Sequence, residues 1–525
     1  MKLKHTLIML LGLWALSTAA QEKRVMVMSN LYVMSPELLK QEGSAFTEAS
    51  KLAPFMYKES SQIFSTMVDT VRKYRPDLVL IPGDLTKSGE LLSHQTVLNT
   101  LDAMRQEGAA VLVIPGEQDI NNENAVYYNG NSTTSAETVT AEQFAELYKD
   151  YGYGENSLRD AQTLSYACEP IEGLVVFGID LQFCDGAFTP ETMAWLKGIA
   201  DAATEEGKQL VGMIHRNAIE HFKAQSEIAS ICVVSEWKAA AKELAQHGLR
   251  LVFTGHQHVQ DVAKFYVNDE CTDSLIDVAT GTLTMYPNAW RLFSVNEQLT
   301  EWSGQTGYVT QVPNVGDVKA KSKAHADANF QNILTHLIAS NWEPIAQVLK
   351  DNEDNLKRIH LENIQTPEQL SDLAIKYLDG TFRKVLYAHL EGNEPQGPVK
   401  SEDIQSEIED AVWDLLGDQL KWYEIAEKPI INLVIKDMLK DELYPGLNSI
   451  LEDINQYDTP QASVTDDLAP VITLPRAEKR YDGLQTLPAD ALMTPAFYTL
   501  DGRQLQGTPQ QKGIYVTAGK KYILR

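Results

Sequence analysis

The sequence predicts an α/β protein that continues into a helical region and ends in a small β-rich module. Short apolar runs rich in β-branched residues alternate with helical patterns from about residue 24 to residue 291. The pattern is then helical to about residue 456, and short β-rich runs return at the end of the chain. With 525 residues, 44% of them hydrophobic, the chain is long enough for about two to four domains with buried cores.

Five apolar runs are predicted to be central strands of the α/β region. They span residues 25–28, 78–81, 110–114, 174–177 and 249–253. These runs are apolar almost without alternation, as is typical of strands that are covered on both faces. Each run ends in polar or glycine-containing residues. Because ligands of α/β sheets bind beyond the carboxyl ends of the strands, we expect the functional residues at these five ends.

The rest of the chain divides by its pattern. Apolar residues recur at helical spacing in 330–338 and 404–416, which predicts amphipathic helices. A proline-rich stretch reads as a linker, and Asp501-Gly502 in the tail is a strong hairpin-turn signal. The predicted divisions are an α/β domain at 21–300, a helical domain at 301–458, a linker at 459–488 and a β-rich tail at 489–525.

Residues 1–20 have the pattern of a signal peptide. Lys2 and Lys4 precede an apolar run at 7–16, and small residues at 18–20 form a cleavage site. We therefore expect an exported protein, located in the periplasm, at the cell surface or outside the cell. No later apolar run approaches the roughly 20 residues that a membrane span needs, so no transmembrane segment is expected in the mature chain.

Charge and cysteine content narrow the function further. The chain has 45 basic and 72 acidic side chains, a net formal charge of −27, which disfavours general nucleic-acid binding. One or two disulfides are possible among the four cysteines of an exported chain, and the sequence does not choose a pairing. The cysteines lack C-x-x-C spacing, which argues against a structural zinc site, and no catalytic role is expected for them.

Histidines and an aspartate stand at the predicted strand ends. The segment Gly255-His256-Gln257-His258 follows one strand, Asp84 follows another, and His215 ends a third apolar run. Imidazoles and a carboxylate that converge at one sheet edge indicate a metal site. The alternative is that these are buried histidines with satisfied hydrogen bonds.

The order of these motifs resembles that of the calcineurin-like metallophosphoesterase superfamily, over about residues 24–291. The family order D-x-H, G-D, G-N-H-D, H and G-H-x-H corresponds here to SNLY, PGDL, PGEQD, MIHRN and TGHQH. The resemblance implies a β-sandwich flanked by helices and a metal-dependent phosphoesterase that acts on a phosphate ester or another anionic small molecule. The surrounding segments look like an exported Bacteroidetes branch of the family.

The C-terminal tail resembles the sorting domains of exported Bacteroidetes proteins. Its sequence from residue 500 is LDGRQLQGTPQQKGIYVTAGKKYILR. This resemblance implies contact with the cell surface or with a secretion machinery. The alternative is an ordinary β module that caps the helical domain.

Four positions depart from the family pattern. Asn30 and Tyr32 stand where the first motif has Asp and His, and Glu117 and Gln118 stand where the third has Asn and His. By correspondence with the family, one metal would be held by Asn30, Tyr32, Asp84 and His258. The other would be held by Asp84, Glu117, His215 and His256.

The two implied metal sites should not bind equally well. An amide and a phenol replace a carboxylate and an imidazole in the first site, which we expect to be empty or weak. The second site offers two carboxylates and two imidazoles, which suit one zinc, manganese or ferrous ion per chain. Glu117 is longer than the family's Asn, so the alternative is that its carboxylate points away from the ion.

Three further residues are candidates for the chemistry. Gln118 replaces the family's acid-base histidine and can donate a hydrogen bond but no proton at neutral pH. Asp119 is expected to orient Gln118. Arg216 could clamp phosphate with two nitrogens, and the other reading, favoured by the sequence, is a surface or supporting cation.

These departures leave three hypotheses for function. The first is an exported phosphoesterase that works weakly or with a single metal. The second is a catalytically inactive relative that binds a phosphorylated or anionic ligand or a protein partner. The third is an interaction protein whose α/β domain is only a scaffold.

Overall fold

The structure is a computed structural model that describes residues 22–223, 225–340, 342–351, 353–358, 363–392, 399–417, 443–452, 466–477, 484–486, 498–499, 513–517 and 520–524. The predicted signal peptide at 1–20 and the predicted turn at 501–502 lie outside these residues. Among the described residues, no helix combines the length and the apolar character that crossing a membrane requires.

Two sheets packed face to face form the core of the molecule. The first has the strand order β18 (Val471–Thr473), β15 (Glu301–Tyr308), β14 (Ala289–Val295), β1 (Lys23–Val27), β3 (Leu78–Pro82) and β4 (Ala110–Ile114). The second has the order β12 (Asp261–Tyr266), β13 (Ser274–Ala279), β11 (Leu251–Thr254), β10 (Gln209–Ile214), β9 (Leu174–Ile179), β8 (Tyr166–Ile171) and β7 (Leu158–Arg159). The sheets touch through β3 against β10 and β4 against β9. The predicted β-sandwich of an α/β protein is confirmed.

The central strands are parallel and buried on both faces. β1, β3 and β4 run parallel in one sheet, as do β9, β10, β11 and β13 in the other. Every residue of β3, β9 and β10 is buried, which is why these segments read as unbroken apolar runs. Because neighbouring parallel strands end at the same edge, their polar carboxyl ends gather in one place.

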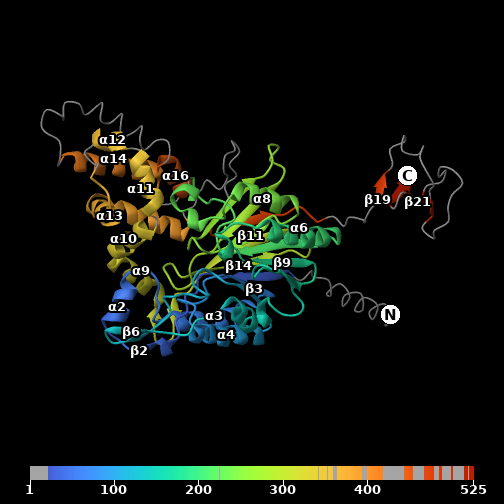
Figure 1. Ribbon diagram of the computed structural model, residues 1–525, viewed down its shortest axis with the longest axis horizontal. Helices are drawn as coiled ribbons and strands as arrows, with labels where there is room; N and C mark the ends of the chain where they lie inside the picture. Colours follow the sequence, from blue (N-terminus) through green and yellow to red (C-terminus); the bar gives the residue numbers. More distant parts are fainter. Residues whose placement is uncertain are drawn as a thin grey trace, which may run out of the picture.

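Helices cover the outer faces of the two sheets (Figure 1). α3 (Ser60–Tyr74) and α4 (Leu91–Gln106) lie on the side of the six-stranded sheet, whereas α6 (Pro190–Glu205) and α8 (Trp237–Gln246) lie on the side of the seven-stranded sheet. α6 begins with Thr189 accepting from the Thr192 amide, followed by Pro190 in the first turn. Each helix buries one apolar stripe against its sheet.

The helical region stands at one end of the sandwich (Figure 1). Its elements are α9 (Val318–Ala328), α10 (Phe330–Ser340), α11 (Trp342–Asp351), α12 (Glu353–Arg358), α13 (Pro367–Glu391), α14 (Ser401–Gly417) and α16 (Leu443–Leu451). The helices predicted at 330–338 and 404–416 are present. The end of α13 packs on the sandwich, where Leu390 joins a cluster with Val259 and Met285.

Shorter elements complete the chain. β2 (Leu39–Gln41), β5 (Val126–Asn129) and β6 (Ser132–Ser135) form a small sheet, and β16 (Gln311–Val312) pairs with β17 (Gly316–Asp317). The short helices are α2 (Ser44–Lys51), α5 (Ala141–Leu147) and α7 (Gln225–Ile228). In the tail, β19 (Leu484–Thr486), β20 (Tyr498–Thr499), β21 (Gly513–Thr517) and β22 (Lys520–Leu524) form a four-stranded sheet.

The first sheet extends beyond the predicted division at residue 300. β15 pairs with β14 from Ala289 opposite Tyr308 to Val295 opposite Trp302, so residue 300 lies inside a hairpin. β18 lies within the range predicted as a linker, yet it pairs with β15 at the sheet edge. Pairing across more than 160 residues depends on backbone hydrogen bonds, which leave no pattern in the sequence.

His94 on α4 is a buried core histidine. Its Nε2 donates to the Asp119 carbonyl at 2.9 Å, so its Nδ1 accepts from the Tyr148 hydroxyl at 2.8 Å. Burial lowers the pKa of His94 from 6.5 to about 4. The hydrogen bond to the Asp119 carbonyl opposes this shift but is the smaller effect. Folding therefore keeps this imidazole neutral at a pH where the unfolded chain would protonate it.

This buried imidazole predicts a loss of stability in mild acid. The unfolded chain binds one more proton than the folded chain between pH 6.5 and 4, so this contribution to the unfolding free energy falls as the pH falls. We expect His94→Gln to reduce the pH-dependent loss between pH 7 and pH 5 by about 2 kcal/mol. Urea unfolding at both pH values measures it, with the exposed His336→Gln as the control. An unchanged loss in His94→Gln would contradict the assignment.

Candidate metal centre

The residues predicted at strand ends converge at one edge of the sandwich. Asp84 follows β3, Glu117 follows β4, His215 follows β10 and His256 follows β11. β3 and β10 belong to different sheets and touch each other. The site therefore lies where the carboxyl ends of both sheets meet.

Two glycines let these ends approach. A Cβ atom on Gly116 would lie 2.2 Å from both the amide nitrogen and Oδ1 of Asp84. A Cβ atom on Gly83, whose φ is +90°, would lie 2.4 Å from Nδ1 of His215. Any larger residue at either position would push the candidate ligands apart.

Asp84, His215 and His256 form a candidate metal-binding group. One ligand atom from each lies within 4.8 Å of the others. His215 donates from Nδ1 to the Pro82 carbonyl at 2.7 Å, which directs its Nε2 toward Asp84 Oδ2 at 3.4 Å and His256 Nδ1 at 3.1 Å. An outer hydrogen bond of this kind fixes the ring orientation of a metal-binding histidine. This donor set fits a zinc, manganese or ferrous ion.

Glu117 reaches the group through His256. Its Oε2 lies 2.8 Å from His256 Nδ1, and its Oε1 accepts from Arg216 Nε at 2.8 Å. Burial opposes the ionisation of Glu117, but His256 and His215 hold its pKa at about 2. The carboxylate therefore points toward the histidines, and Arg216 fixes its other oxygen.

The electrostatics of the site favour an ionised carboxylate. Burial opposes the charge on Asp84, but His215, His256 and the Gln118 amide hold its pKa below the usual range. Burial likewise opposes protonation of His256, and Glu117 overcomes it and raises its pKa well above the ordinary value. Without a cation, the protons on the histidines balance the carboxylates, and a divalent ion would compete with these protons.

The first-motif residues are engaged in other contacts. Tyr32 donates its hydroxyl to Asp84 Oδ2 at 2.7 Å and stacks on Phe55, with the ring centroids 3.9 Å apart. Burial, and then Asp84, raise the pKa of Tyr32 well above its ordinary value, so the phenol stays protonated. Asn30 donates from Nδ2 to the Gly255 carbonyl at 2.6 Å, and its buried Oδ1 has no partner among the described residues. A protonated phenol is a poor ligand for a divalent ion, so the weak or empty first site stays a prediction.

His258 lies on the Tyr32 side of the site. Its Nδ1 is 2.7 Å from the Thr282 hydroxyl, and its ring contacts those of Tyr32 and Phe55. Burial, and then His256, lower the pKa of His258 to about 3. It is therefore a neutral imidazole at physiological pH.

Four of the site residues have left-handed backbone conformations. Their φ values are 51° for Asn30, 44° for Tyr32, 50° for Asp84 and 66° for His258. Such conformations are uncommon for residues other than glycine and persist only where the surrounding structure imposes them. Their concentration here indicates that the fold holds these loops in a fixed, costly geometry.

Gln118 and Asp119 both make contacts with the loop that carries Asp84. Gln118 donates its backbone amide to Asp84 Oδ1 at 2.9 Å, and its side chain accepts from Asn122 at 3.0 Å. Asp119 accepts from the amides of Leu85, Thr86 and Gly116 and from the Thr86 hydroxyl. It therefore ties the Asp84 loop to the Glu117 loop and does not orient the Gln118 side chain. Burial, and then Asp84, raise the pKa of Asp119 to about 7.

Arg216 is held by Glu117 and is not a free phosphate clamp. The pair is about one-fifth exposed, with side-chain exposures of 18% for Arg216 and 26% for Glu117. The expectation of a bidentate clamp would require Arg216 to leave this carboxylate. The structure shows instead that Arg216 positions Glu117.

Sequence reasoning missed the Cys232 thiol, which contacts the His256 imidazole. All four cysteines are free in the structure. Cys232 ends a short 3-10 helix (Ser230–Cys232), 24 residues before His256, and no spacing rule links the two. The contact depends on how the segment after β10 folds back over the site.

Comparison with known proteins supports the resemblance. Residues 57–260 match the family model described as calcineurin-like phosphoesterase. This range contains Asp84, Glu117, His215 and His256 and begins after Asn30 and Tyr32. No curated protein matches the sequence.

Solved structures of metallophosphatases are similar to the chain at low identity. A dimetal phosphatase from Danio rerio has 10% identity and a TM-score of 0.37, and the match covers 54% of this chain and 95% of that one. A purple acid phosphatase from yellow lupin seeds has 10% identity and a TM-score of 0.34, with 57% and 53% covered. A 5'-nucleotidase precursor from Thermus thermophilus has 12% identity and a TM-score of 0.33, with 60% and 59% covered.

Proposed function

We propose that this chain is a metal-dependent phosphoesterase with one divalent ion held by Asp84, His215 and His256. The observation that carries the proposal is the convergence of these three side chains at the edge of the sandwich. The match of residues 57–260 to the calcineurin-like phosphoesterase family supports phosphate-ester chemistry. Glu117 lies outside this three-residue group but contacts His256, so it would become a fourth ligand if its carboxylate turned from His256 Nδ1 to the ion.

Each residue of the site would have a distinct role in the reaction. A divalent ion bound there would supply Lewis acidity toward a phosphoryl oxygen and lower the pKa of a water molecule. His215 is fixed by the Pro82 carbonyl, and Glu117 by Arg216, so both enter the site already oriented. The Gln118 backbone amide donates to Asp84, and its side-chain amide would be able to donate a hydrogen bond to a phosphate oxygen.

The same geometry predicts slow turnover. Gln118 cannot deliver a proton to a leaving group, and loss of general acid help typically costs about 10²–10⁴-fold in rate. Tyr32 places its hydroxyl on an Asp84 oxygen that a second ion would need. We therefore expect activity toward activated esters, whose leaving groups need no proton.

The Tyr32 hydroxyl on Asp84 favours a second candidate function. A cleft with one weak cation and no proton donor is suited to binding an anionic ligand without hydrolysing it. In this reading the chain is an inactive relative that captures a phosphorylated molecule or a protein partner.

Metal content and turnover of the same preparations test the proposal. We expect about one manganese, iron or zinc ion per refilled and desalted chain, as measured by elemental mass spectrometry, and slow hydrolysis of p-nitrophenyl phosphate. His256→Ala should lose both, because it removes a ligand. His247→Ala is the matched control. His247 follows the last turn of α8, away from the site, and pairs with Asp201 near the surface.

Each other outcome would favour a different function or a different metal content. Two ions per chain would show that Asn30 and Tyr32 do not disable the first site. One ion without turnover would favour the inactive relative, and no ion would contradict the metal centre itself. Export, and contact of residues 489–525 with a secretion machinery, rest on the sequence alone and stay predictions.

A further inference from the structure

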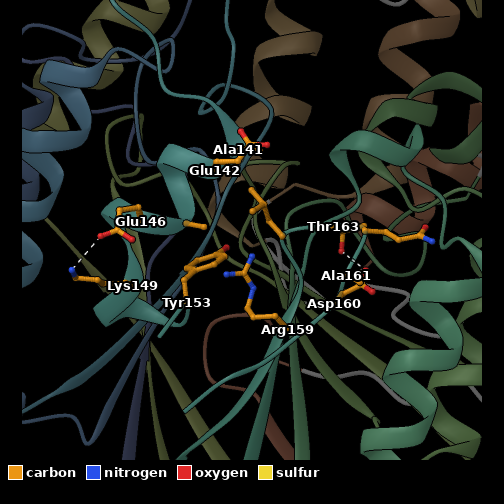
Figure 2. Close-up of a pocket in the computed structure, with 12 residues that line it drawn as sticks. Ala141, Glu142, Glu146, Lys149, Tyr153, Arg159, Asp160, Ala161 and Thr163 are labelled. Atoms are coloured by element: carbon orange, nitrogen blue, oxygen red, sulfur yellow. Dashed lines mark hydrogen bonds and ion pairs between the residues drawn. The ribbon is translucent and has the colours of Figure 1, made fainter. Parts of the chain in front are cut away.

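We propose that a pocket beside α5 is a second binding site, for the carboxylate or phosphate group of a small organic anion. The pocket has a volume of about 600 Å³ and lies between α5 and the segment 159–164, which joins β7 to β8. Figure 2 shows its lining residues. None of them belongs to the candidate metal centre, so this site does not depend on the proposed function.

Arg159 is the residue that points to an anion. It lies on β7, at the edge of the seven-stranded sheet, and its guanidinium stacks over the ring of Tyr153 with 4.7 Å between the guanidinium carbon and the ring centroid. Within the described residues, the guanidinium makes no hydrogen bond or ion pair, and its Nε is buried without a partner. A stacked guanidinium is held in place and can offer its terminal nitrogens as a fork to an oxyanion.

The carboxylates that line the pocket are bound to other side chains and form no ion pair with Arg159. Asp160 accepts from the hydroxyls of Thr163 at 2.7 Å and Thr192 at 2.9 Å. Glu146 pairs with Lys149 at 3.2 Å, and Glu142 accepts from the Thr140 hydroxyl at 2.9 Å. Each acidic side chain therefore has a partner within the protein. Outside the lining, the buried Asp180 feels the charge of Arg159, but its oxygens accept from the amides of Leu164 and Gln182.

Tyr153 provides a second observation. Its side chain is 6% exposed, and its hydroxyl is buried without a hydrogen-bond partner among the described residues. In Figure 2 the hydroxyl end of Tyr153 points toward the Arg159 guanidinium. Buried polar groups without a protein partner are few in folded proteins, and a ligand or ordered water commonly satisfies them.

The remaining lining sets the kind of anion. Ala141, Ala145, Ala161 and Leu164 supply small apolar surfaces around the charged end. A pocket of this size takes a small molecule and leaves no room for a folded partner. The ligand that fits is an organic anion with a compact apolar body, such as an aromatic or aliphatic acid or a phosphorylated metabolite.

Ligand-observed NMR tests the site with two matched probes. Benzoate and phenylphosphonate share a ring and differ in the oxyanion, and neither is a substrate for ester hydrolysis. We expect saturation transfer from the full chain to at least one probe, in the presence of a chelator that removes any ion from the metal centre. The tighter probe identifies whether the site takes a carboxylate or a phosphate.

Variants locate the binding. We expect Arg159→Gln to weaken binding at least about tenfold, since it removes the charged fork. Arg105→Gln is the matched control, because Arg105 also stacks over a tyrosine ring, that of Tyr151, but is already paired with Asp150 at 3.1 Å. Ala161→Trp, at an exposed position, should abolish binding by filling the pocket and leaving the charge in place.

The proposal fails if neither probe binds, or if binding survives Arg159→Gln. It also fails if Ala161→Trp, folded as judged by its melting curve, binds as the wild type does. Should Arg159→Gln not fold, the Ala161→Trp result decides alone.

Discussion

Replacing Asp84 by asparagine is expected to remove the metal ion and the activity while leaving the fold intact. Asp84 is 1% exposed and accepts from the Tyr32 hydroxyl and from the Gln118 amide, so an isosteric amide keeps the volume of the side chain. An amide oxygen carries no charge, and we expect the ion content to fall from about one to below about 0.1 per chain. Losing several kcal/mol of charge stabilisation should lower turnover by at least about 10³-fold.

Asp77→Asn is the matched control for this substitution. Asp77 directly precedes β3 and Asp84 follows it, so the two carboxylates stand at opposite ends of one strand. Asp77 accepts from Lys23 and from the Arg24 amide, well away from the metal-binding group. Elemental analysis and p-nitrophenyl phosphate hydrolysis should show wild-type values for Asp77→Asn. Full metal content in Asp84→Asn would contradict the assignment of Asp84 as the central ligand.

Among the substitutions considered for their effect on stability, Arg291→Leu is expected to lower the free energy of unfolding most. Arg291 is fully buried on β14, and its guanidinium donates to the carbonyls of Ala279, Asp261 and Asp467. Leucine would leave these acceptors without their charged donor and leave a cavity. Each buried carbonyl left without a donor costs about 1–3 kcal/mol, so we expect a total loss of about 3–5 kcal/mol. Urea unfolding measures the change.

The place where the structure opens first distinguishes a local effect of Arg291→Leu from a uniform loss of stability. Because Arg291 binds the Asp467 carbonyl, amide hydrogen exchange should rise first in residues 466–477, which include β18. Arg72→Leu is the control, since Arg72 lies on the surface of α3 with a 56% exposed side chain. Its effect should stay within about 0.5 kcal/mol. A stability loss below about 1 kcal/mol in Arg291→Leu would contradict the account of the network.

The sequence determined the elements of the fold because local signals specify them. The strands predicted at 78–81 and 110–114 are present as β3 and β4, since apolar runs bounded by glycine and proline allow little else. The edge strand β18 was not predicted, because it consists of three residues whose pairing with β15 is decided by position in space. Pattern shows which segments form strands, and long-range contact decides which strands pair.

The site follows the same division. The sequence indicated that Asp84, His215 and His256 would meet, because the carboxyl ends of parallel strands share one edge. It could not show that Arg216 is bound to Glu117, that Asp119 ties two loops together, or that Cys232 touches His256. The types and order of residues determine which chemistry is available. Side-chain directions and hydrogen-bond partners depend on atoms far apart in the chain, and only the tertiary structure decides them.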